Sequence, residues 1–414
     1  MSGNTDSFFD WEPFPGALKH AIVEGYLEDA FPILLRNPGK DVIYADLFAG
    51  AGEYESGAPG SPKIAARLAG RRHASSQTPR IYCFNVEREK QTYDKLVASL
   101  REFPAEVVMS RPGDWHDHYQ ELAGLMQGKS SIVFLDPFRL DVELDALEDF
   151  VRPIGQESRE LILTLHMHGI YRNIQAAAKE ERRRQEAELQ GRSPALMPRD
   201  YYRKLNAVLG RQWWHELLVN GELPSANFGK LAEGYCAQLR SMGSPSARGR
   251  KAVAVPIPHR LGGAISYYLI FVTRSPTAVT RFSDAADAAV TAGWRRPDAE
   301  LLQRRTRAGQ QMHLLPDLAP EFELTFEEQR SRELLPLLAE EVTAFFARRP
   351  WPVEFRWLHA ELAERFCGRF SERHIREIVV AQRAAGVLGT STPAVSRHTV
   401  VGPAASVSSS PLAS

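Results

Sequence analysis

The sequence predicts an α/β protein with a parallel sheet covered by helices on both faces, followed by a small, mainly helical domain. Strand-like and helix-like segments alternate over residues 42–165. The strands are near-continuous apolar runs, which is typical of strands buried on both faces. After about residue 324 the pattern changes to three helices and a short hairpin.

The first half supplies most of the predicted sheet. Ser61 is a plausible helix N-cap, because it stands just before Pro62 at the first helical position. The elements expected in order are a helix over 17–35, a strand at 42–45, a helix over 62–68, a strand at 81–86, a helix over 88–100, a strand at 107–109, a helix over 115–125, and strands at 131–135 and 161–165.

A helical stretch interrupts the sheet. Residues 171–239 read as helix, and strand character returns at 252–257 and 265–272. We therefore interpret the helices as an insertion within one domain that covers residues 1–325. The charged run at 179–184 mixes both signs, and it is interpreted as a solvated helix face.

The C-terminal domain, residues 326–402, has the order of a winged helix-turn-helix: helices at 332–348, 355–366 and 371–385, then a hairpin. The Ser-, Ala- and Pro-rich residues 403–414 are expected to be disordered. The third helix carries arginines that suit phosphate and base-edge contacts, although Glu372 and Glu377 reduce its positive potential and winged helices also dock proteins. The candidate nucleic-acid residues are Arg373, Arg376 and Arg383.

Composition sets broad limits. A chain of 414 residues exceeds one ordinary domain, and its 51 basic and 51 acidic side chains balance, so net charge neither indicates nor excludes a nucleic-acid partner. Cys83, Cys236 and Cys367 form no CxxC pair, which argues against a disulfide framework or a zinc finger. The polar start is unlike a signal peptide, and no apolar run approaches the ~20 residues that span a bilayer. We expect a cytoplasmic protein.

A glycine-rich turn follows the first strand. Gly50 and Gly52 allow positive φ and close backbone approach, and a ligand there would lie at the carboxyl end of the sheet. Glu87 ends the next strand and could accept hydrogen bonds from both ribose hydroxyls of an adenosyl group. Asp114 follows the third strand, where an adenine contact is expected. The alternatives are a tight turn without a ligand, a surface glutamate and ordinary turn chemistry. The candidate cofactor residues are Asp46, Phe48, Ala49, Gly50, Gly52, Glu87 and Asp114.

Asp136, Pro137 and Phe138 end the fourth strand. Many methyltransferases that act on base amino groups have an acidic or amide residue, prolines and an aromatic residue at this point. The polar side chain accepts hydrogen bonds from the amine, and the aromatic ring stacks on the base. One proline stands here instead of two, so the signature is incomplete. The alternative is a structural strand end that Asp136 caps. These three residues are the catalytic candidates.

Two His-x-His pairs, His116/His118 and His166/His168, raise the question of a metal. Alternate residues of a strand share a face, but no further ligands stand at characteristic spacing, so no metal site is predicted. Pocket-lining or surface histidines are favoured instead. The candidate substrate contacts are Lys19, Tyr54, His166 and Arg172.

These motifs resemble the three-Cys-motif partner proteins (TcmP). The matching stretches are residues 19–27, 46–54 and 57–65 with Gly60-Ser61-Pro62, 134–138 and 267–271, within a resemblance that covers residues 10–290. The family implies a class I, Rossmann-like S-adenosylmethionine (SAM) methyltransferase fold. It also implies a radical-SAM-like partner bearing three cysteines, usually in bacteria. Arg139 stands where glycine commonly follows Asp-Pro-Phe, a departure that affects the acceptor pocket.

The sequence therefore predicts a SAM-dependent methyltransferase. Its acceptor is expected to be a nucleic acid or a substrate shared with the radical-SAM-like partner. Two alternatives stay open. One is a non-catalytic module that binds nucleic acid or a partner protein. The other is a metal-dependent nuclease of a mobile-element or defence system.

Overall fold

The computed structural model describes residues 13–36, 41–73, 80–137, 142–152, 157–190, 201–242, 249–312 and 324–407. The chain forms two compact units, here called the N-terminal unit (Asp10–Ala278) and the C-terminal unit (Val279–Ser414). The domain boundary predicted at residues 325–326 falls inside the C-terminal unit.

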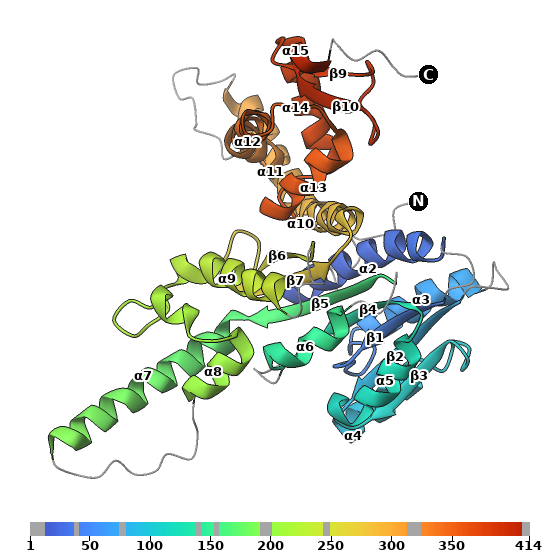
Figure 1. Ribbon diagram of the computed structural model, residues 1–414, viewed down its shortest axis with the longest axis vertical. Helices are drawn as coiled ribbons and strands as arrows, with labels where there is room; N and C mark the ends of the chain where they lie inside the picture. Colours follow the sequence, from blue (N-terminus) through green and yellow to red (C-terminus); the bar gives the residue numbers. More distant parts are fainter. Residues whose placement is uncertain are drawn as a thin grey trace. The chain divides into compact units, whose positions relative to one another are not determined.

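The N-terminal unit is built on one seven-stranded sheet (Figure 1). Its order is β3-β2-β1-β4-β5-β7-β6, and β7 alone runs antiparallel to the other six strands. Chain order reverses between β1 and β4, which is the switch point of a Rossmann-like sheet. The strands are β1 (Val42–Asp46), β2 (Ile81–Glu87), β3 (Val108–Pro112), β4 (Ser130–Leu135), β5 (Arg159–His166), β6 (Lys251–Pro258) and β7 (Ile265–Thr273).

Helices cover both faces of this sheet. On one face α2 (Phe14–Leu34) packs on α3 (Ser61–His73), and Tyr26 of α2 meets Phe271 of β7 edge-on at 4.9 Å between ring centroids. On the other face α5 (Tyr119–Met126) and α6 (Leu144–Val151) bury leucines against apolar strand residues such as Val133. Because strand residues alternate between faces, Tyr44 and Asp46 belong to the α2 side, whereas Ile43 and Ala45 belong to the α5–α6 core. Helix α4 (Lys90–Ser99) follows β2.

The helical insertion lies between β5 and β6, as predicted. In Figure 1 α7 extends away from the sheet as an arm, and α8 lies beside the first part of α7. The insertion consists of α7 (Met167–Leu189), α8 (Tyr201–Leu209), η3 (Trp213–Leu217), η4 (Ser225–Asn227) and α9 (Phe228–Ser241). Helix α7 begins directly after His166, so the arm grows from the carboxyl end of β5.

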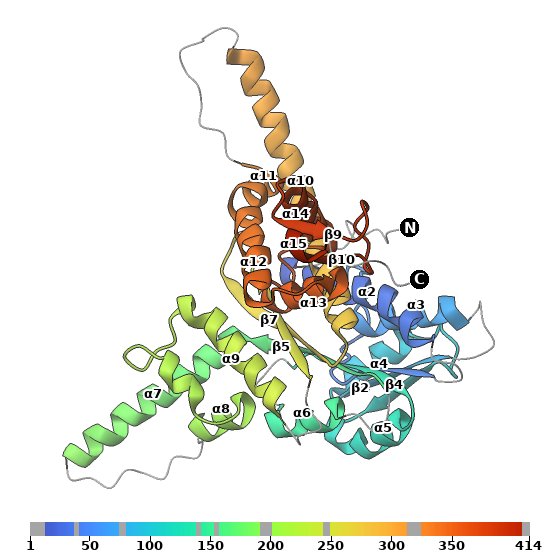
Figure 2. The same ribbon diagram turned by 45° about the horizontal axis from the view of Figure 1, so that its top comes forward.

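The C-terminal unit combines helices with a small antiparallel sheet of order β8-β10-β9, and its core includes Val342, Phe355 and Val379 (Figure 2). The elements are α10 (Pro276–Met312), which begins at the end of the N-terminal unit, α11 (Phe326–Gln329), the π-helical turn η6 (Arg330–Leu334), α12 (Leu335–Arg348), β8 (Val353–Glu354), α13 (Phe355–Arg365), α14 (Glu372–Ala384), β9 (Leu388–Thr390), β10 (Val400–Pro403) and α15 (Ala404–Val407).

Several elements differ from the sequence prediction. Helices α6 and α10 were not predicted, and α10 continues through Pro297, a residue that normally ends or kinks a helix. The tail predicted to be disordered from residue 403 is ordered at its start, because Pro403 pairs with Leu388 and α15 follows. Residues 408–414 lie outside the described residues.

None of the helices in the described ranges is long and apolar enough to cross a membrane.

Candidate functional site

The strongest sequence candidates meet at one edge of the sheet. Asp46, Glu87, Asp136 and His166 lie at or just beyond the carboxyl ends of β1, β2, β4 and β5. The carboxyl ends of parallel strands share an edge, and ligands of open α/β sheets bind there at the switch point. The topology therefore brings together residues that are up to 120 positions apart in the chain.

The glycine-rich turn is tied to the sheet on both sides. The amide of Leu47 donates to the carbonyl of Phe134 (3.1 Å), and that of Ala49 donates to the carbonyl of Val86 (3.0 Å). Gly50 has φ +62°, and a Cβ added to it would meet nothing within 4 Å. Gly52 has φ +75°, but its Cβ would lie 2.4 Å from the Oγ of Ser99. The two glycines thus serve different needs: Gly50 borders open space, and Gly52 allows the turn to pack on α4.

Glu87 holds the turn in place. One carboxylate oxygen, Oε2, accepts a hydrogen bond from the amide of Gly50 (2.9 Å), and Oε1 accepts one from the amide of Glu89 (2.8 Å). The predicted pair of Gly50 and Glu87 is therefore in direct contact. An ionised carboxylate has about four acceptor positions, so Glu87 keeps acceptor capacity for a further donor.

Asp114 is engaged locally. It is the N-cap of η2 (Trp115–His118) and accepts hydrogen bonds from the amide of His116 (3.1 Å) and from its ring Nδ1 (2.6 Å). Burial would raise the pKa of Asp114, but the hydrogen bonds from His116 and the charge of Arg88 lower it. The adenine contact predicted for this position stays a prediction.

Asp46 is a fully buried carboxyl group. Its Oδ2 accepts from the hydroxyl of Ser61 (2.6 Å), and its Oδ1 accepts from the amide of Phe48 (3.3 Å). Burial raises the pKa of Asp46 to about 7 despite these hydrogen bonds, and the nearby charge of Asp136 raises it further. Ser61, which the sequence suggested as a helix N-cap, directs its hydroxyl to Asp46 instead.

Asn85 stands opposite Asp46 in the register of β1 and β2. Its side chain is fully buried, yet neither the oxygen nor the nitrogen of its amide has a hydrogen-bond partner among the described residues. Buried polar groups are rarely unpaired, and the exceptions require an explanation such as an ordered water or ligand. The face of the sheet beneath the glycine-rich turn is therefore polar, and some of its buried hydrogen-bonding groups have no partner among the described residues.

A second polar group, the Asp136 cluster, consists of Lys19, Asp136, Thr164 and His166. The ammonium of buried Lys19 forms an ion pair with Asp136 Oδ2. The Thr164 hydroxyl donates to Asp136 Oδ1 (2.6 Å), and His166 Nε2 lies 3.7 Å from the same oxygen. Burial alone would raise the pKa of Asp136, but the charge of Lys19 and the hydrogen bonds around the carboxylate hold the pKa well below its usual range. Asp136 is therefore an ionised carboxylate in fixed orientation.

His166 has one ring nitrogen available. Its Nε2 is buried and makes no hydrogen bond, because 3.7 Å to Asp136 is too long for one. The ring packs against Tyr267 at 5.1 Å between centroids, and the Tyr267 hydroxyl donates to the carbonyl of Pro15 (2.5 Å).

Sequence reasoning missed Ser61, Thr164 and Tyr267 as site residues. Thr164 could have been found, because it alternates with His166 along one strand and so shares its face. The position of Tyr267 could not be predicted, because its contact with His166 depends on the antiparallel register of β5 and β7.

The remaining candidates are more scattered. Tyr54 is 39% exposed, with its ring 5.7 Å from that of His20. Arg172 is exposed on the second turn of α7, and Pro137 is buried after β4. Phe138 lies outside the described residues.

The three arginines predicted to contact nucleic acid are all engaged within the C-terminal unit. Arg373 bonds Glu377 (2.8 Å), and Arg376 bonds Glu372. Arg383 donates to the Thr390 hydroxyl (3.0 Å) and to nearby backbone carbonyls. The guanidinium groups of Arg376 and Arg383 therefore support the fold of this unit, whereas Arg373, 82% exposed, forms only a surface ion pair.

One group of residues in the described part of the chain has donor atoms spaced for a metal ion: Asp284, His359 and Glu372, within 4.8 Å of one another. Glu372 already pairs with Arg376 and, at 2.8 Å, with Arg397. Two guanidinium groups on one ligand oppose the binding of a cation, so the arrangement is better explained as an ion-pair network.

Comparison with known proteins gives no family assignment. No protein-family model and no curated protein matches the chain. Among solved structures, protein LPL1258 from Legionella pneumophila, of family model DUF519, aligns with a TM-score of 0.33 and 9% identity, covering 64% of this chain and 86% of that one. The O-methyltransferase TomG from Streptomyces achromogenes, involved in tomaymycin synthesis and in complex with SAM, aligns with a TM-score of 0.29 and 15% identity, covering 60% and 78%. The Rossmann-like fold is accordingly assigned from the strand order.

Proposed function

We propose that the N-terminal unit is a SAM-dependent methyltransferase. The observation that carries this proposal is the contact between Gly50 and Glu87 at the switch point of the sheet, with open space beside Gly50. The strand order, with β7 alone antiparallel, supports the class I methyltransferase fold that the family resemblance implies. Gly50, Glu87 and Asp46 are the residues that we propose to hold the cofactor.

The donor set fits an adenosyl sulfonium. Glu87 has acceptor positions for ribose hydroxyls, and Gly50 presents backbone with no side chain in the way. Asp46 is a buried carboxyl group whose pKa, raised by burial, would fall on contact with an ammonium group. When bound, SAM supplies an electrophilic methyl group.

The Asp136 cluster is the proposed acceptor site. Lys19 keeps Asp136 ionised, and Thr164 fixes its orientation, so the carboxylate orients an N–H or O–H group by accepting its hydrogen bond. His166 stands close enough to hold the proton that the acceptor loses. Most of the rate is expected from alignment of the reacting groups. The base-stacking role predicted for Phe138 remains part of the proposal.

Calorimetric titration with SAM tests the cofactor site. Gly50→Val fills the open space beside the turn and should abolish binding. Gly128→Val is the matched control, because Gly128 also has positive φ (+70°) and open space around its Cβ, but precedes β4 at the opposite edge of the sheet. Both variants carry a comparable backbone cost of about 1–2 kcal/mol. No binding by the wild type, or equal loss in both variants, contradicts the proposal.

The finer assignments are proposed with it. The C-terminal unit, with α12, α13 and α14 followed by β9 and β10, is proposed to be a winged helix-turn-helix. Membership of the three-Cys-motif partner family predicts a complex with a radical-SAM-like protein, which co-purification tests. Transfer of labelled methyl to nucleic acid or to that partner, lost in Asp136→Ala, supports an enzyme over a binding module.

A further inference from the structure

Helix α7 carries exposed basic side chains along its length, and its first turn lies next to the proposed acceptor site. Its apolar residues Ile170 and Ile174 are buried in the core of the N-terminal unit. Its exposed surface presents the α7 basic stripe, which we define as Arg172, Lys179, Arg182 and Arg183. His166 immediately precedes the helix, so the stripe is anchored to the Asp136 cluster.

The stripe differs in its ion pairing from the arginines of the C-terminal unit. Within the described residues, none of its four side chains forms an ion pair, and the one hydrogen bond is from Arg182 Nε to the carbonyl of Ala178 (3.4 Å). This contrasts with Arg373 and Arg376 of the C-terminal unit, which are both paired with glutamates. Unpaired guanidinium and ammonium groups are free to bind phosphate oxygens.

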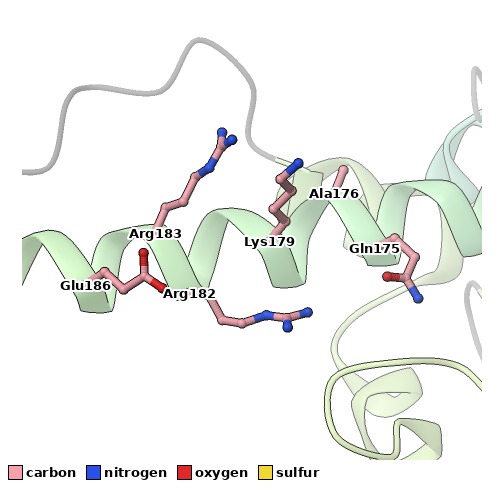
Figure 3. Close-up of a pocket in the computed structure, with 6 residues that line it drawn as sticks. All are labelled: Gln175, Ala176, Lys179, Arg182, Arg183 and Glu186. Atoms are coloured by element: carbon pink, nitrogen blue, oxygen red, sulfur yellow. The ribbon is translucent and has the colours of Figure 1, made fainter.

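The middle of the stripe forms a hollow. Figure 3 shows Lys179 and Arg183 extending from one side of the helix and Arg182 from the other, with Ala176 near Lys179. The hollow is lined by Gln175, Ala176, Lys179, Arg182, Arg183 and Glu186. Three cations and one carboxylate make it positive, and an anion can approach the helix closely because the side chain of Ala176 is small.

The length of the stripe suits a polymer. At a rise of 1.5 Å per residue, Arg172 to Arg183 spans about 16 Å, and Arg172 starts about 9 Å from His166. Phosphates of one duplex strand follow every 3.4 Å of helix axis, so the stripe matches about five phosphate steps. A polyanion along it leads towards the Asp136 cluster.

We propose that the α7 basic stripe binds the sugar-phosphate backbone of the nucleic acid that the enzyme modifies. The inference rests on the proposed methyltransferase function and names its substrate class. A membrane surface is disfavoured, because the hollow holds no apolar side chain larger than that of alanine and membrane-bound helices need a large apolar face. The C-terminal arginines, which the sequence suggested, would then be structural.

Fluorescence anisotropy measures nucleic-acid binding in the absence of SAM. A negative result for the α7 basic stripe is therefore distinct from a negative result for the cofactor site. The probes are short fluorescein-labelled duplex DNA, single-stranded DNA and RNA. The variant Arg172→Gln/Lys179→Gln/Arg183→Gln should reduce the slope of log K against log salt by about 2 to 3 and weaken binding at least tenfold. Glu186→Gln removes the carboxylate of the same hollow and should strengthen binding.

The control is Arg373→Gln/Arg376→Gln/Arg383→Gln, which should leave the salt slope unchanged. An unchanged slope in the α7 variant, or an equal loss in the C-terminal control, overturns the proposal. Competition by polyglutamate as strong as that by nucleic acid of equal charge would indicate an acidic protein and also overturns it. Circular dichroism melts confirm that each variant is folded. The nucleic acid bound most tightly by the wild type identifies the form of the substrate.

Discussion

Replacing Asp46 by asparagine should make the protein more stable at neutral and alkaline pH. The carboxyl group is fully buried, and its pKa is raised to about 7, whereas an unfolded aspartate has a pKa of about 3.9. Below pH ~4 the group is protonated in both states and has no effect. As pH rises through the folded pKa, burial of the charge comes to cost about 4 kcal/mol, at 1.36 kcal/mol per pKa unit.

Urea unfolding between pH 4 and pH 8 measures this cost. The wild type should lose about 4 kcal/mol more stability than Asp46→Asn over that range, because the amide cannot ionise. The same substitution should weaken SAM binding by about tenfold to a hundredfold, since one charge-assisted hydrogen bond is lost. A stabilised variant that binds SAM poorly would show that the buried carboxyl group is kept for function.

Glu160→Gln is the matched control. Glu160 is also buried, its pKa is also raised by burial to about 7, and it accepts hydrogen bonds from Tyr26 and from Ser158 (3.1 Å) at the amino end of β5. It should show a similar pH effect on stability and no effect on SAM binding. If Asp46→Asn keeps the wild-type pH dependence, the burial argument is wrong. If Glu160→Gln weakens binding equally, the effect of Asp46 on the cofactor is indirect.

Two further predictions concern the cluster and the thiols. Lys19→Met leaves Asp136 as a buried charge without its cation and should cost about 3–5 kcal/mol of stability, measured by urea unfolding. Adding Asp136→Asn should restore most of this loss. A double variant no more stable than Lys19→Met contradicts the prediction. The three thiols, Cys83, Cys236 and Cys367, are buried, and burial raises the pKa of Cys83 and of Cys236 to about 12. Mass spectrometry after maleimide treatment should therefore find no label on the native protein and label on all three thiols in denaturant. Rapid labelling of the native protein would show that the core opens.

The sequence identified several residues that meet at the carboxyl edge of the sheet, because its signals there are local. Gly50 and Gly52 follow an apolar strand directly, and Glu87 and Asp136 end strands that are equally apolar. Parallel topology then places these residues together without further information. The distinction between an open Gly50 and a packed Gly52 needed the structure, because it depends on where α4 lies.

Long-range pairings were beyond sequence reasoning. Lys19 was a candidate substrate contact, and its pairing with Asp136 depends on how α2 lies across the sheet. Helix α10 was missed because Pro297 indicates a break, which packing overrides. Helix α6 could have been found, since Leu144, Leu147 and Val151 recur at helical spacing.

The hydrogen bond between Glu87 and Gly50 affects how a ligand would be received. Since the carboxylate already fixes the turn, the backbone conformation of the turn is set before a ligand binds. The conformational entropy of ordering this segment is lost during folding and does not reduce affinity at the moment of association. Binding at this edge should therefore require little conformational change of the protein. Fast association would be its kinetic signature.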